Sequence, residues 1–206
     1  QDVTLDGNVK GTSRESLVVD ITAYKFNKLH TEDLKLENAT LKLTTSTIKT
    51  WDEVPGDGGD LPFREVLNGY TWNFKNVSFV GTALEAATQI SNMFVDNSDI
   101  SIDYQRDDVA MGQSSFNLAG RGVLPSEIRN STFTLHNALF GIVVLDSSLN
   151  IGNSKININL SSDEEFARDH GSFGLYSENG QVKIDNSELN ITSENSYQGG
   201  VAVYGT

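Results

Sequence analysis

The sequence has no cysteine, only three prolines in 206 residues, and few basic residues. Without cysteine, neither a disulfide framework nor a thiolate metal site is possible. Its 15 Lys and Arg stand against 28 Asp and Glu, a formal charge of −13, which excludes nucleic-acid binding through phosphate neutralisation. No apolar run reaches the roughly 18 residues of a membrane span, and the start at Gln1 has no signal-peptide pattern, so no membrane insertion is expected. The chain is rich in Asn, Ser and Gly, a composition typical of bacterial extracellular and surface proteins.

An internal repeat is the strongest pattern in the chain. Each copy has an apolar residue two positions before an Asn, a small residue after it, and two apolar residues that alternate with polar ones. Alternation with a period of two places the apolar side chains on one face of a strand, and Asn tolerates the left-handed backbone of a tight turn. Each copy therefore predicts a strand, a turn and a strand, with stacked Asn side chains forming a ladder. The repeated residues are Asn38, Asn76, Asn97, Asn130, Asn153 and Asn186.

The spacing of these residues indicates the architecture. They are separated by 38, 21, 33, 23 and 33 residues, and the short intervals match one coil of a β-solenoid. A second motif at 140–144, 173–177 and 199–203, an apolar residue or Gly followed by Gly and alternation, supplies another strand of each coil. We predict an all-β chain, a right-handed parallel β-helix (β-solenoid) of about seven to nine coils, with one short helical candidate at 162–165. Residues 1–206 form a single domain, and because no cap follows its last strand-like run we expect it to belong to a longer surface protein.

The three long intervals predict insertions at one corner of the stack, after Leu43, Ile102 and Leu160. Loops on a rigid scaffold are favoured places for binding, although insertions also accumulate wherever a scaffold tolerates them. An exposed indole or phenol in such a loop would stack on a sugar ring, and an adjacent guanidinium would suit an acidic sugar. Trp72 alternates with Phe74 and is predicted to lie in the core instead. The same insertions also carry Phe116, and the candidate ligand-binding residues are Trp51, Tyr104, Arg106, Arg121, Arg168 and His170.

Three runs of sequence carry a family resemblance: WNFKNVSFVG, VDNSDISI and KIDNSELNITSENSYQGGVAVYG. In pattern and texture the chain from about Leu34 onward resembles the pectate-lyase-like β-helix domains of Gram-positive surface adhesins, such as the binding regions of serine-rich-repeat adhesins. The resemblance implies a noncatalytic domain at the bacterial cell surface that binds extracellular polysaccharide or host glycans. It also implies a monomeric domain within a larger surface protein.

An enzyme is the alternative, because pectin-type lyases and hydrolases share this fold. The Asp107–Asp108 pair and the His170–Gly171 segment look similar to hydrolase motifs, but 62 residues separate Asp108 from His170, about 14 Å of stacking. Acid–base hydrolysis needs two carboxyl groups across one sugar, so we assign no catalytic residue. Asp107 and Asp108 are the candidate Ca²⁺ ligands, although such a pair is more often a solvated turn. No cofactor is required, and a structural stalk is the third hypothesis.

Overall fold

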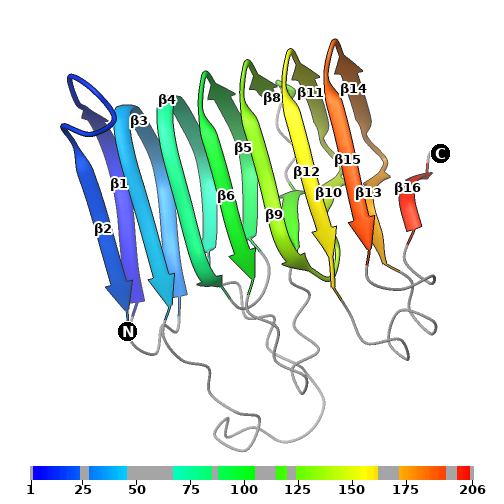
Figure 1. Ribbon diagram of the computed structural model, residues 1–206, viewed down its shortest axis with the longest axis horizontal. Helices are drawn as coiled ribbons and strands as arrows, with labels where there is room; N and C mark the ends of the chain where they lie inside the picture. The colour runs from blue at the N-terminus through cyan, green and yellow to red at the C-terminus, as the bar shows by residue number, and fades with distance from the viewer. Residues whose placement is uncertain are drawn as a thin grey trace, which may run out of the picture.

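The computed structural model describes residues 2–23, 28–45, 67–84, 88–104, 115–119, 124–161, 172–193 and 199–204. Over these residues the chain forms strands and turns and no helix, so the all-β prediction is confirmed and no helical membrane span occurs in this part (Figure 1). The helical candidate at 162–165 lies outside the described residues.

The strands are β1 (Asp2–Lys10), β2 (Val18–Ala23), β3 (Lys28–Thr45), β4 (Leu67–Leu84), β5 (Thr88–Asp96), β6 (Asp99–Tyr104), β7 (Phe116–Ala119), β8 (Ser126–Arg129), β9 (Thr132–Ala138), β10 (Ile142–Leu145), β11 (Ser148–Gly152), β12 (Lys155–Leu160), β13 (Phe173–Glu178), β14 (Gln181–Asp185), β15 (Glu188–Ser193) and β16 (Gly199–Tyr204).

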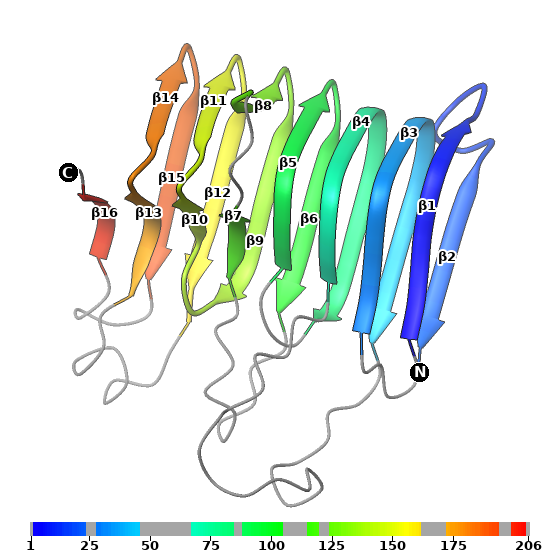
Figure 2. The ribbon, with the colours of Figure 1, turned by 180° about the vertical axis from the view of Figure 1, so that it is seen from behind.

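Two ladders of parallel strands form opposite walls of one stack. Ladder A contains β1, the first halves of β3 and β4, β5, the pairs β7/β8, β10/β11 and β13/β14, and β16. Ladder B contains β2, the second halves of β3 and β4, β6, β9, β12 and β15. Figure 1 views the stack from the side of ladder B, and Figure 2 from the side of ladder A.

Each coil runs along ladder A, turns, and returns along ladder B. The described chain makes seven such coils, at 2–23, 28–45, 67–84, 88–104, 116–138, 142–160 and 173–193, and β16 adds the first strand of an eighth. A parallel β-helix with about seven to nine coils is thus confirmed. Its right-handed sense stays a prediction, which follows the strong preference of parallel strand crossovers for that hand.

The repeat Asn residues occupy the turns between the two ladders, as predicted. All six have a positive φ, between 45° at Asn186 and 53° at Asn76. This left-handed backbone reverses the chain within about two residues, and Asn adopts it at lower cost than other residues with a Cβ. The turns therefore lie above one another along one edge of the stack, which we call the turn edge (Figure 1).

The space between the ladders is filled by the alternating apolar residues of both walls. Trp72 is 1% exposed, which confirms its predicted place in the core. Its ring centroid lies 5.0 Å from that of Phe74, 5.4 Å from that of Phe79 and 5.9 Å from that of Phe116. Phe133 continues this aromatic cluster, with its centroid 4.9 Å from that of Phe116. Later coils fill the same space with aliphatic side chains, which are Ile128, Leu149, Ile151, Ile156, Ile158 and Leu160.

Ladder A has a second bend that becomes a break in the later coils. In β4 and β5 the chain passes this level as continuous strand, whereas Asp146 (φ 47°) separates β10 from β11 and Asn179 (φ 51°) separates β13 from β14. Just before β10 lies Gly141, which is the Gly of the second sequence motif at 140–144. A Cβ there would lie 2.0 Å from the carbonyl oxygen of Gly174 in the next coil, so only glycine fits between the two rungs.

Candidate functional site

The predicted insertions begin at the edge opposite the turn edge. Within ladder B, Leu43 of β3 is in register with Gly81 of β4, Gly81 with Ile102 of β6, and Ile102 is connected through β9 to Ile158 of β12. The ends of β3, β6 and β12 therefore lie along one edge, which we call the insertion edge, as the sequence spacing predicted. The predicted residues Trp51, Arg106, Asp107, Asp108, Arg121, Arg168 and His170 lie outside the described residues.

Tyr104 does not occupy the exposed position predicted for it, and Phe116 lies in a strand of the core instead of in an insertion. Tyr104 is 1% exposed, and its hydroxyl donates to the backbone oxygen of Ser115 at 2.9 Å and lies 3.2 Å from Oγ1 of Thr88. Burial raises the pKa of the Tyr104 hydroxyl, so this side chain stays neutral. Phe116 begins β7 and is fully buried. The missed signal is the alternation of β6, in which Ile100 and Ile102 point inward and Tyr104 follows them.

The turn edge carries a ladder of Asn side chains. Nδ2 of Asn76 donates to Oδ1 of Asn38 at 2.7 Å, and Nδ2 of Asn97 donates to Oδ1 of Asn76 at 3.4 Å. Further along the stack, Nδ2 of Asn186 donates to Oδ1 of Asn153 at 2.6 Å. The predicted ladder thus exists in two segments, each of which ties neighbouring turns together.

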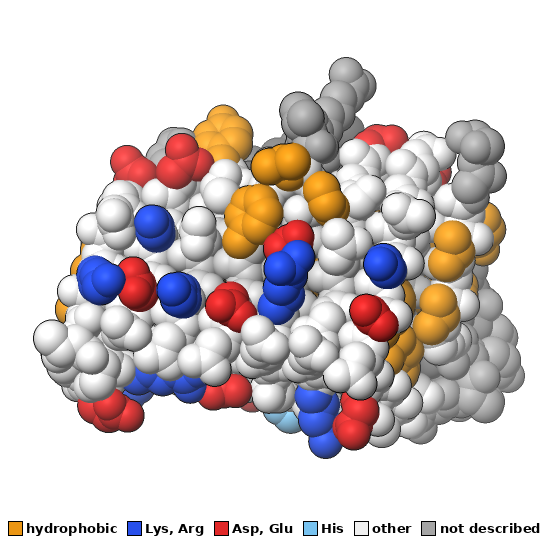
Figure 3. Space-filling model, turned by 90° about the horizontal axis from the view of Figure 1, so that it is seen from above, with side chains coloured by type: hydrophobic (Ala, Val, Ile, Leu, Met, Phe, Trp, Pro, Cys, Tyr) orange, Lys and Arg blue, Asp and Glu red, His pale blue; other side chains and the backbone are white. Residues whose placement is uncertain are grey.

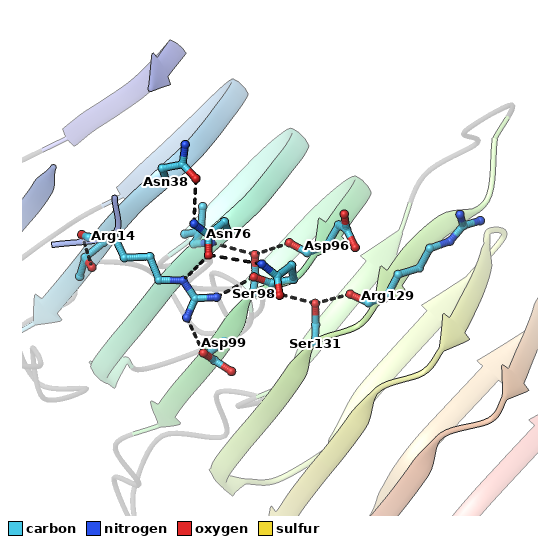
Figure 4. A network of polar contacts seen from close by, with 11 residues as sticks. Arg14, Asn38, Asn76, Asp96, Ser98, Asp99, Arg129 and Ser131 are labelled. Carbon is cyan, nitrogen blue, oxygen red and sulfur yellow. Dashed lines mark hydrogen bonds and ion pairs between the residues drawn. The ribbon is translucent and has the colours of Figure 1, made fainter. Parts of the chain in front are cut away.

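Arg14 crosses this ladder from the first coil. Its Nε donates to Oδ1 of Asn76 at 2.9 Å, one terminal nitrogen donates to the backbone oxygen of Asn97, and the other pairs with Asp99, both at 2.6 Å (Figure 4). The planar guanidinium supplies all three bonds with one fixed fork. Because Arg14 lies in the turn between β1 and β2, it fastens the first coil to the third and fourth. No local sequence signal identifies this contact, since 85 residues separate Arg14 from Asp99.

A second ladder of serines, which follow the turn Asn residues, was not recognised from the sequence. The backbone N–H of Val77 donates to Oγ of Ser98, and that of Ser98 donates to Oγ of Ser131 (Figure 4). In the next coil the N–H of Ser131 donates to Oγ of Ser154. The N–H of Ser154 donates to Oγ of Ser187 in the same way. Each of these bonds is 3.0–3.1 Å long and lies within or next to the core. The small residue of the repeat is therefore a hydrogen-bonding group that satisfies a buried N–H of the preceding coil.

The outer surface of ladder B in the later coils is rich in amides and hydroxyls held by one another. Nδ2 of Asn190 donates to Oδ1 of Asn157 at 3.1 Å, and Nδ2 of Asn157 donates to Oγ1 of Thr134 at 3.3 Å. Nearer the insertion edge, Nδ2 of Asn159 donates to Oγ1 of Thr192 at 3.3 Å. We call this surface the amide face; its members are Thr134, Asn157, Asn159, Asn190 and Thr192. Side chains that support one another in this way present donors and acceptors in fixed directions.

The chain has five Asn-x-Ser/Thr sequences, the pattern of glycosylation sites, and their Asn residues lie in the turns or on the amide face. The amide nitrogens of Asn38, Asn76 and Asn130 donate to a backbone carbonyl, to Asn38 and to Asp96, respectively. Those of Asn159 and Asn190 are donors on the amide face. Turn and ladder chemistry therefore accounts for these residues without glycosylation.

The shifted carboxyl groups do not have the properties of a general acid. Hydrogen bonds from a backbone N–H and from Ser13 lower the pKa of Glu15, and a hydrogen bond from Lys10 lowers that of Glu37. A general acid for glycoside hydrolysis needs a raised pKa, which neither group has. Within the described ranges, no group of three or more His, Cys, Asp or Glu side chains could hold a metal ion. The predicted Ca²⁺ ligands Asp107 and Asp108 lie outside these ranges.

Comparison with known proteins adds no relative. A scan against protein-family models gave no match, and searches of curated proteins and of solved structures found no significant similarity.

Proposed function

We propose that this chain is a noncatalytic adhesin-type domain of the bacterial cell surface, which binds extracellular polysaccharide or host glycans. The observation that carries the proposal is the amide face, where side-chain amides and hydroxyls of three successive coils are held in register beside the insertion edge. Sugars are recognised largely through hydroxyl groups, each of which both donates and accepts a hydrogen bond, and Asn offers both functions in one planar group. Because the ladder fixes these groups before a ligand arrives, little side-chain entropy is lost on binding.

The spacing of the coils supports an extended ligand. Neighbouring rungs lie about 4.8 Å apart, so a chain of sugars along the stack meets equivalent side chains at regular intervals. The predicted aromatic and basic residues Trp51, Arg106, Arg168 and His170 belong to segments that start at the adjoining edge. The pectate-lyase-like relationship implied by the sequence remains part of this proposal.

The amide face favours a neutral glycan, because a chain of charge −13 repels acidic polymers at neutral pH. An acidic glycan would bind more tightly with Ca²⁺ as a bridge, or at about pH 4.5, where carboxylates begin to protonate.

The test is a glycan array on the purified chain at neutral pH and at about pH 4.5, with and without Ca²⁺, followed by titration of any glycan that binds. We expect Asn190→Ala and Asn157→Ala to weaken binding about tenfold or more, as loss of a ligand hydrogen bond in a fixed site does. The matched control is Asn150→Ala, on the outer surface of ladder A in the same coil as Asn157, which should bind as the parent does. Tyr104→Phe should also leave affinity unchanged, because that ring is buried.

Three outcomes would contradict the proposal. Absence of binding to every glycan under every condition would favour the stalk hypothesis. Binding that is lost equally in Asn150→Ala would place the site on ladder A instead. Release of new reducing ends or unsaturated sugars from a bound polymer would make the chain an enzyme of the pectin-degrading kind.

A further inference from the structure

The outer surface of ladder A differs from the amide face, because it carries charges of both signs in regular order. The register of the strands defines two columns of outward side chains that run along the stack. The first column, over coils 1 to 6, is Asn8, Lys35, Asn73, Phe94, Glu127 and Asn150. The second column, over the same coils, is Lys10, Glu37, Lys75, Asp96, Arg129 and Gly152. The sign in the second column alternates from one coil to the next through the first five coils, and we call this surface the charged face (Figure 3).

The charged face is nearly balanced in charge, although the chain as a whole is strongly acidic. Over coils 1 to 5 its basic residues are Lys10, Lys35, Lys75 and Arg129, and its acidic residues are Asp6, Asp33, Glu37, Asp96 and Glu127. The whole chain, by contrast, has 28 acidic and 15 basic residues. A second copy of this acidic protein would therefore meet less repulsion on this surface than the net charge of the chain implies.

An apolar patch adjoins the charges near the middle of the stack. Tyr70 is 57% exposed and Leu124 is 63% exposed, and Phe94 of the first column is half-buried between coils 3 and 5. Nδ2 of Asn92 donates to the backbone oxygen of Leu124 at 2.9 Å, which fixes this residue against coil 4. Figure 3 shows hydrophobic side chains gathered beside the row of charges. An apolar centre with charged surroundings is the usual composition of a protein–protein interface.

Within one chain the alternating charges attract one another across neighbouring strands, and Lys10, Lys75 and Lys35 lower the pKa of Glu37, but few of these pairs close to a salt bridge. In the second column only Lys10 and Glu37 approach to ion-pair distance, with Nζ 3.0 Å from Oε1. Among the described residues Lys75 and Lys35 form no ion pair, and Arg129 pairs with Glu127 on its own strand, at 2.9 Å. The alternating order is therefore available to a partner with the complementary order.

We propose that the charged face binds a second copy of this chain, related by a two-fold axis that runs along the strand direction between coils 3 and 4. This axis reverses the stacking direction, so that coil 3 faces coil 4 of the other copy and coil 2 faces coil 5, while each column faces itself. Lys75 then meets Asp96 of the second copy, Glu37 meets its Arg129, and Lys35 meets its Glu127. Each pair occurs twice in the dimer, giving self-complementary contacts.

The other two-fold arrangements bring fewer opposite charges together, or like charges. An axis along the stack through the second column would place each coil opposite itself, so that Lys75 meets Lys75. An axis one coil further along, between coils 4 and 5, brings Glu37 opposite Asp185 and Lys35 opposite Lys183. An axis between coils 2 and 3 opposes charges only in the second column, where Lys10 meets Asp96 and Glu37 meets Lys75. The register between coils 3 and 4 alone makes three kinds of opposed pair with no like-charged one.

The experiment is sedimentation velocity of the purified chain over a wide range of concentration, with two charge-reversal variants. Lys75→Glu places two acids opposite each other, and Asp96→Lys places two lysines there, so each should raise the dimer dissociation constant about tenfold or more. An equimolar mixture of the two variants restores both contacts in a heterodimer, and dimer should reappear. Lys42→Glu, an exposed residue of ladder B in coil 2, is the control and should dimerise as the parent does. Circular dichroism of each variant verifies folding, since Asp96 also accepts a hydrogen bond from Asn130.

Recovery of dimer in the mixture, but in neither variant alone, would establish both the surface and the register. A parent chain that is monomeric at all concentrations would overturn the proposal and return the chain to the monomer expected from its sequence. A dimer that Lys75→Glu leaves intact, or a mixture that stays monomeric, would also overturn it. These results do not depend on whether the amide face binds a glycan.

Discussion

The early and late coils close the same Asn turn with different side chains. In coils 2 and 3 the residue after the turn Asn is Ala39 or Val77, and the turns are joined by amides of the Asn ladder and by Arg14. In coils 4 to 7 it is Ser, and each Ser accepts a hydrogen bond from the preceding coil, in addition to the amide bond from Asn186 to Asn153 in coils 6 and 7. Ser98 joins the two regions, because its Oγ accepts a hydrogen bond from the N–H of Val77 in coil 3. The comparison teaches that the left-handed turn is the constant element, while the contact between coils can be made in more than one way.

The early and late coils also fill their cores with different kinds of side chain. Around Trp72 the coils hold a compact aromatic cluster, whereas coils 6 and 7 stack aliphatic residues such as Ile158 and Ile191. Both fill the same space between the ladders. Alternation decides which positions point inward, and packing with neighbouring coils decides which side chain suits each position.

Removing the largest core side chain should have the largest effect. We expect Trp72→Ala to lower the free energy of unfolding by about 4 kcal/mol, and Ile156→Ala by about 3 kcal/mol, because both lose buried surface and leave a cavity. Urea unfolding followed by circular dichroism gives both values. Asn73→Ala, which points outward from the same strand as Trp72, is the control and should change stability by less than about 0.5 kcal/mol. If Ile156→Ala proved the more costly, the aromatic cluster would not be the more strongly packed region.

Changing a turn residue should separate backbone strain from side-chain contacts. Asn76→Ala removes the hydrogen bonds of the ladder and introduces a residue that adopts the positive φ of this turn (53°) at a higher energetic cost. We expect it to lower the free energy of unfolding by about 2 kcal/mol. Asn76→Gly restores the backbone and should lose only about 1 kcal/mol, the part due to the hydrogen bonds. Equal losses in the two variants, measured by urea unfolding, would mean that strain in this turn is negligible.

A hydrogen bond of the serine ladder should contribute slightly less to the free energy of unfolding than an Asn turn does. Ser131→Ala leaves the buried N–H of Ser98 without its acceptor, so we expect a loss of about 1–2 kcal/mol. Hydrogen exchange at the amide of Ser98 should accelerate, while the amide of Val77, whose acceptor is untouched, changes less. Uniform acceleration over the whole stack would instead indicate a global effect.

The smallest effect is expected for Arg14, whose side chain is 24% exposed. Arg14→Ala should cost about 1 kcal/mol, since solvent partly replaces its contacts. Arg14→Lys keeps the charge but cannot reproduce three bonds from one planar group, so it should recover little of the loss. Hydrogen exchange should rise in the first coil and not in coils 6 and 7. Full recovery in Arg14→Lys would show that charge alone matters.

Of the candidate binding surfaces, the sequence predicted the insertion edge but neither the amide face nor the charged face. The insertion edge follows from spacing along the chain, which can be counted. The amide face joins Thr134, Asn157 and Asn190, and the charged face joins Lys75, Asp96 and Arg129; each set comes from different coils whose lengths differ. The members of each set can be recognised as neighbours only once the register of the strands is known. Tyr104 was misplaced because it was assigned to the predicted insertion after Ile102, whereas the alternation of β6 continues through it and carries it inward.

The sequence by itself determined the strands, the Asn turns and the parallel stack, because these depend on the period of the apolar residues and on the backbone preference of Asn. Both are properties of a few neighbouring residues. The tertiary structure alone decided which side chains of successive coils lie opposite one another, how Arg14 reaches the third and fourth coils, and that the small residue of the turn serves as an acceptor. These contacts join residues 21–85 positions apart, and their geometry is set by the register between coils, which no single repeat contains.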